Sequence, residues 1–208
     1  KHLEDLCTIV KITTDYGPIS KIIGGILMET DPNTIMISCD DDIIFPSSYI
    51  EKLYTKSLQY PNHVIGARGL NIGRFPGYIT IYDDFESKKS IRYLWTLSTD
   101  ENNPSSVDIV FGSSGIVYRR GFFPATWKDA ERKFISKVFL HPDIFKNDDI
   151  LISGYLSTKN IPRILFTMPK LQRQISSDGL SSFQIPFYMS VAKSIMKSQD
   201  WGMFKNRV

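Results

Sequence analysis

Apolar residues occur along this chain in two patterns, short continuous runs and runs with helical spacing. Short apolar runs bounded by turn residues are typical of buried strands, whereas apolar positions three or four residues apart predict amphipathic helices. Strands are predicted at 6–12, 35–37, 64–70, 78–82, 91–97 and 161–166, and on both sides of 112–115 within 107–117. Helices are predicted at 19–28, 47–58, within 122–139, from 150 onward and at 187–197.

The order strand, helix, strand at the beginning of the chain predicts a parallel pair with a right-handed crossover. Near-continuous apolar strands are also what a parallel sheet buried on both faces requires. We therefore predict a single α/β domain with a mixed, mostly parallel central sheet between helices. At 208 residues the chain is long enough for one such domain with a substantial core.

The most informative stretch is 33–46, in which an apolar run leads directly into Asp40, Asp41 and Asp42. In open α/β sheets ligands bind at the carboxyl ends of the strands. Three adjacent carboxylates repel one another unless a positive charge lies among them, and a hard divalent cation with substrate phosphates is the simplest candidate. The alternative is a helix N-terminus, because Asp is favoured in a first turn. That alternative accounts for one Asp better than for three.

Composition narrows the functional classes. The net charge of +3 is small and the basic residues are scattered, so nucleic acid is not an expected partner. No apolar run approaches the length of a membrane span, and no secretory signal pattern is present, so we expect a cytoplasmic protein. Cys7 and Cys39 lie in strand-like runs and are predicted to be buried thiols. The chain begins with Lys, which leaves open that it is part of a longer protein.

Two further motifs carry candidate chemistry. The segment Gly112-Ser113-Ser114-Gly115 interrupts an apolar run, which indicates either close backbone approach to a ligand or a bulge. Asp148-Asp149 begins a predicted helix, so the pair is either a cap or a source of a general base.

The segments DYGPISK, CDDDIIFP, VDIVFGSSGIVYRR and NDDILISGYL, spread over about residues 6–165, together resemble nucleotide-sugar glycosyltransferases of the GT-A (Rossmann-like) fold. The nearest resemblance is to family-2-like inverting enzymes, in particular glycosyltransferase domains of large DNA viruses of algae. It implies transfer of a sugar from a nucleoside diphosphate, UDP first, to a glycan or glycoprotein hydroxyl, with Mn²⁺ or Mg²⁺ at a DXD motif. If the chain is viral, its compartment is the host cytoplasm.

The resemblance also assigns residue roles. Asp42 would bind the metal, Asp40 would lie near ribose and metal, and Asp41 would be the middle residue. A register shifted by one would make Asp41 the principal ligand. In the second pair, Asp149 would be the base that deprotonates the acceptor and Asp148 its helper or a helix cap.

Lesser candidates follow from the same comparison. A loop facing the nucleotide would comprise Thr14, Asp15, Gly17 and Lys21; Lys21 is equally well a solvated helix residue. Gly112, Ser113, Ser114 and Gly115 would line the donor sugar. His141 is a third metal ligand, a contact for the acceptor or an ordinary loop histidine, and Arg173 either steadies the diphosphate or is solvated.

In domain terms, 1–70 would form the nucleotide-binding half, 71–170 the donor-sugar and acceptor half, and 171–208 a C-terminal tail with a helix. The chain has only a few residues where GT-A enzymes have a further N-terminal strand and helix.

Two hypotheses compete with the glycosyltransferase. One is a sugar-1-phosphate nucleotidylyltransferase, whose Gly-rich loop is not matched by GPISK. The other is a non-catalytic Ca²⁺ or carbohydrate-binding module, in which Asp148-Asp149 would have no role.

Overall fold

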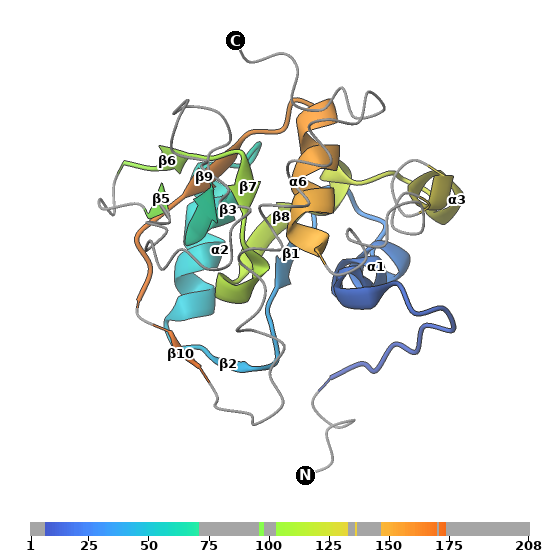
Figure 1. The fold of residues 1–208 in the computed structure, drawn as a ribbon, viewed down its shortest axis with the longest axis horizontal. Coiled ribbons are helices and arrows are strands. Elements are labelled where there is room, and N and C mark those ends of the chain that lie inside the picture. The colour runs from blue at the N-terminus through green and yellow to red at the C-terminus, as the bar shows by residue number, and fades with distance from the viewer. Residues whose placement is uncertain are drawn as a thin grey trace, which may run out of the picture.

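A computed structural model of the chain describes residues 7–70, 96–97, 103–132, 136, 147–169 and 171–173. Its main sheet has five strands in the order β1-β8-β3-β9-β6 (Figure 1). They are β1 (Ile35–Ser38), β8 (Ile116–Arg119), β3 (Val64–Gly66), β9 (Arg163–Leu165) and β6 (Ser105–Ser106). Two smaller sheets join β10 (Gln172–Arg173) to β2 (Ile43–Ile44), and β5 (Thr96–Leu97) to β4 (Arg68–Leu70) and β7 (Ile109–Val110).

The predicted mostly parallel, GT-A (Rossmann-like) sheet is wrong. In the five-stranded sheet β1–β8, β8–β3 and β9–β6 are antiparallel, and β3–β9 is the parallel pair among the described strands. The predicted strand at 6–12 is also wrong for its described part, since residues 7–12 form no strand. Strand β8 comes from much later in the chain, lies between β1 and β3, and runs antiparallel to both.

The strands are apolar because helices cover both faces of the sheet, whatever the direction of the strands. Helix α2 (Tyr49–Gln59) packs on one face, where Tyr49 and Leu53 meet Ile65, Val117 and Ile164. Helices α1 (Ser20–Met28) and α6 (Asp148–Thr158) cover the other face (Figure 1). The apolar runs that we interpreted as a sign of parallel pairing therefore reflect burial on two sides.

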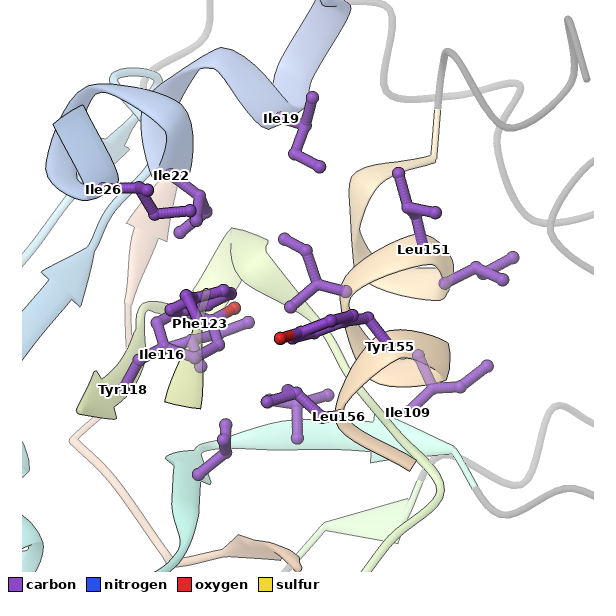
Figure 2. Close-up of a cluster of buried hydrophobic side chains, with 14 of the residues drawn as sticks. Ile19, Ile22, Ile26, Ile109, Ile116, Tyr118, Phe123, Leu151, Tyr155 and Leu156 are labelled. Carbon is purple, nitrogen blue, oxygen red and sulfur yellow. The ribbon is translucent and has the colours of Figure 1, made fainter. Parts of the chain in front are cut away.

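The larger core lies between α1, α6 and the sheet, as Figure 2 shows. Phe123 and Tyr155 stack at its centre with their ring centroids 6.2 Å apart, and Tyr118 meets Phe123 edge-on. Ile22 and Ile26 of α1 and Leu156 of α6 belong to the same cluster as these rings (Figure 2). Every residue of α6 from Asp148 to Leu156 is buried, which makes α6 an interior helix and encloses both of its acidic residues.

The predicted helices at 19–28 and 47–58 are confirmed as α1 and α2. The N-cap residue of α2, Ser48, makes no side-chain capping hydrogen bond. The predicted strand at 64–70 divides into β3 and β4, and the segment 122–139 contains the short helix α3 (Trp127–Ala130).

Some predictions fall partly or wholly outside the described residues: the strand at 78–82, most of the strand at 91–97 and the helix at 187–197.

The buried-thiol prediction is wrong for Cys7, which is exposed, while Cys39 is half-buried. Since no strand forms at 7–12, nothing requires this run to be covered, and Ile9 is 50% exposed. Among the described helices, none has the length and apolar character needed to cross a membrane.

Candidate functional site

The sheet topology brings the two predicted motifs of the middle of the chain to one place. Strands β1 and β8 are antiparallel and Ser38 pairs with Ile116, so the carboxyl end of β1 adjoins the beginning of β8. Asp40 follows β1 by two residues. The 3₁₀ turn η3 (Gly112–Ser114) comes just before β8. The acidic run and the Gly-Ser segment therefore meet at the same edge of the sheet.

Lys21 joins the first acidic run to the second. Its Nζ atom lies 2.7 Å from Asp40 Oδ1, to which it donates a hydrogen bond, and 3.0 Å from Asp148 Oδ2. Lys21 lies in the first turn of α1. The residue as a whole is exposed, but its side chain is only 26% exposed. The side chains of Asp40 and Asp148 are 28% and 8% exposed. A lysine predicted to face the nucleotide thus lies between two carboxylates.

Asp149 is held by the Gly-Ser segment. Its Oδ1 accepts a 2.8 Å hydrogen bond from the backbone N–H of Gly112. A second bond, 3.3 Å from Val110 N–H to Ser153 Oγ, fixes α6 to the same stretch of chain. The side chain of Asn147, which precedes α6, makes no capping hydrogen bond. The first turn of α6 therefore places the Asp149 carboxylate against the turn η3.

Burial and charge determine the protonation of this cluster. Burial, and then the neighbouring Asp148, raise the pKa of Asp149 well above its usual value, while Lys21 and the Gly112 N–H oppose the shift. Burial lowers the pKa of Lys21, but Asp148 and Asp40 more than offset it, so the net shift is upward. The site combines a permanently charged ammonium with a carboxyl group of raised proton affinity.

Tyr118 is a neighbour of the site that sequence reasoning missed. It lies in β8, is 2% exposed, and pairs with Met36 of β1. Burial raises the pKa of its hydroxyl, and the charges of Asp149, Asp148 and Asp40 raise it further. Strand alternation along 116–119 could have indicated that Tyr118 shares a face with Ile116. Which helix would cover that face was not predictable from the pattern.

The Gly-Ser segment forms a tight turn that α2 supports from the other side. Gly115 has φ of +77°, a backbone conformation that favours glycine. The hydroxyl of Tyr49 donates a 2.5 Å hydrogen bond to the carbonyl of Ser114, and burial raises the pKa of Tyr49 to about 12. Ser113 is exposed, whereas the Ser114 hydroxyl is buried and makes no hydrogen bond within the described part of the chain.

We expect Gly112→Ala to disturb the site. A Cβ atom at Gly112 would lie 2.9 Å from Asp149 Oδ1 and 3.1 Å from Lys21 Nζ, so the Asp149 carboxylate has to move. Overpacking of this kind costs about 1–3 kcal/mol of unfolding free energy, measurable by urea denaturation.

The matched control for this change is Gly24→Ala. A Cβ there meets nothing within 4 Å, and Gly24 lies inside α1. Replacing a helical Gly by Ala should stabilise the protein by about 0.5–1 kcal/mol. Equal effects of the two substitutions would show that the contact with Asp149 has no energetic weight.

The predicted nucleotide loop also has a local structural role. Asp15 Oδ1 accepts a 2.8 Å hydrogen bond from Gly17 N–H, and Gly17 has φ of +70°. This turn leads through η2 (Gly17–Ile19) into α1 and so positions Lys21. Thr14 is exposed beside it.

The predicted metal ligands are not assembled by the described residues. Asp40 is paired with Lys21, Asp42 is half-buried, Asp41 is exposed, and His141 lies outside the described residues. Within the part of the chain that the structure describes, no group of three or more His, Cys, Asp or Glu is arranged to hold a metal ion. These residues do not fit a cation held by protein side chains alone.

The other predicted phosphate ligand, Arg173, can be placed by its backbone. It lies in β10, where it pairs with Ile43 of β2, the residue that follows Asp42. The C-terminal part of the described chain therefore runs alongside the end of the acidic run. This proximity was not evident from the sequence, because the two segments are far apart along the chain.

Comparisons with known proteins add no family to this description. A scan against known protein families found no match, and a search of curated proteins found none either. The resemblance to glycosyltransferases rests on the residues themselves.

Proposed function

We propose that this chain is a glycosyltransferase of the hexosyltransferase type, which moves a sugar from a nucleoside diphosphate, UDP first, to a hydroxyl group of a glycan with inversion. One observation carries the proposal. Residues that were assigned to such a reaction from four separate segments meet at one end of the sheet: Lys21, Asp40, Gly112, Asp148 and Asp149.

Asp149 is the group best suited to the proton transfer. In a single displacement the acceptor oxygen bonds to the anomeric carbon while the bond from that carbon to the diphosphate breaks. The hydroxyl proton passes to the base. Burial raises the pKa of Asp149 above its ordinary value, so its carboxylate is a stronger base than an exposed one, and the Gly112 N–H orients it.

The charge balance of the cluster favours the sugar over the diphosphate. Three carboxylates face one ammonium, so the surroundings suit hydroxyl donors and the positive charge that develops at the anomeric carbon. The diphosphate needs positive charge from elsewhere, and Arg173, whose backbone pairs beside the acidic run, is the residue assigned to it. The Mn²⁺ or Mg²⁺ that the resemblance implies has no step in this proposal.

The test is release of nucleoside diphosphate from UDP-sugars, with GDP-sugars as the comparison, with and without a glycan acceptor. We expect slow release without acceptor and faster release with it, from UDP-sugars first. Assays with and without Mn²⁺ measure directly whether the rate of release depends on the metal. Pyrophosphate exchange in place of release would indicate a nucleotidylyltransferase, and an α-linked donor that yields an α-linked product would refute inversion. If calorimetry detects binding of neither UDP nor GDP, the proposal fails.

A further inference from the structure

We propose that Lys21 supplies the cation of the acidic centre, so that its ammonium occupies the position between Asp40 and Asp148 that a divalent ion could otherwise take.

The geometry of the ion pairs is the first argument. The Nζ atom of Lys21 lies within 3.0 Å of a carboxylate oxygen from each of two separate segments. Mg²⁺ and similar hard cations are commonly held by one or two carboxylates with water completing the shell. A divalent ion at the Nζ position would need the two oxygens to close by less than about 1 Å. The centre therefore has the carboxylates of a cation site and already contains a cation.

The burial of Asp148 is the second argument. Its side chain is 8% exposed, and its Oδ2 accepts no hydrogen bond within the described residues, although Lys21 lies 3.0 Å away. A buried carboxylate without hydrogen bonds is costly unless a positive charge faces it. Oδ2 thus relies on an ionic partner more than on hydrogen bonding, and another cation could replace the ammonium there.

The position of Lys21 in its helix is the third argument. It belongs to the first turn of α1, which contains no acidic residue. A cation near a helix N-terminus is disfavoured by the helix dipole. The compensation comes from Asp40 and Asp148, so the lysine is held there by the acidic centre and not by its own helix. Tethering to α1 also gives the ammonium a high effective concentration against free metal.

The experiment is a titration with Mn²⁺ near neutral pH, followed by the paramagnetic resonance signal of the free ion, on the wild type and on Lys21→Met. Met retains much of the volume of the side chain but not its charge. We expect Lys21→Met to bind Mn²⁺ about tenfold or more tightly than the wild type, a change of about 1.4 kcal/mol. Adding Asp148→Asn should abolish the gain, and Lys21→Arg, which keeps a cation, should not produce it.

Two results would overturn the inference: equal Mn²⁺ affinity of the wild type and Lys21→Met, or a gain that survives Asp148→Asn. Ions held by Asp41 or Asp42 do not confuse the result, because Asp148 lies in a different segment. If Lys21→Met folds poorly, Lys21→Gln is the second variant, and excess Mn²⁺ should raise its thermal midpoint more than that of the wild type. The readout is metal binding, so the result does not depend on the proposed function.

Discussion

Asp149→Asn is expected to lower the rate of sugar transfer by about 100-fold or more, the usual contribution of a general base. The substitution keeps the side chain nearly the same size, and the Asn Oδ1 can still accept the hydrogen bond from Gly112 N–H. What it removes is the ability to take a proton from the acceptor hydroxyl. The measurement is nucleoside diphosphate release in the presence of acceptor, at saturating donor.

Two controls make this result specific. Glu51→Gln removes a carboxylate from the exposed first turn of α2 that has no part in the proposed reaction, and it should leave the rate unchanged. Near-ultraviolet circular dichroism should show that Asp149→Asn retains the native packing of Tyr118 and Tyr155. A variant that is folded and fully active would remove Asp149 from the mechanism.

The same variant has a second signature in the pH dependence of stability. The pKa of Asp149 is raised on folding, so between its unfolded value of about 4 and its higher folded value the folded chain holds a proton that the unfolded chain has released. The contribution of Asp149 to the free energy of unfolding therefore falls as pH rises through that interval. Urea denaturation at a series of pH values should show a smaller fall for Asp149→Asn than for the wild type.

The convergence of the candidate site could be anticipated in part from local chemistry. Asp40, Gly112 and Asp149 were each singled out from their local sequence, although a helix N-terminus or a bulge remained the structural alternative. Such signals are local, so they survive an error in topology. These residues are brought together by the pairing of β1 with β8, two segments about 80 residues apart. Neither segment's sequence indicates that the other is its partner.

Strand direction and ion pairing were not predictable for a related reason. A strand covered on both faces has the same apolar pattern in a parallel or an antiparallel pair, so the pattern of β1 could not reveal that β8 would be its neighbour. The role of Lys21 depends on Asp148, over a hundred residues away, so the local pattern equally allowed a solvated lysine. Residues that act through distant charges require the fold before they can be assigned.

Arg120→Met is expected to give the largest loss of stability, about 3–5 kcal/mol of unfolding free energy. Arg120 is 3% exposed and follows β8. Its guanidinium donates hydrogen bonds to backbone carbonyls at the end of α1 and in the segment after β8, those of Ile26, Glu29, Phe123, Pro124 and Ala125. Met fills part of the space but donates no hydrogen bond, so the carbonyls of Ile26, Phe123 and Pro124 lose a buried donor, and urea denaturation measures the cost.

The neighbouring Arg119 provides the matched control. It is half-buried and donates to two carbonyls, those of Asn33 and Ser57, at 2.9 and 3.1 Å. Water can replace the donor more readily at this partly exposed site, so Arg119→Met should cost about 1 kcal/mol. Comparable losses for the two substitutions would mean that the Arg120 bonds do not hold α1 to the segment after β8.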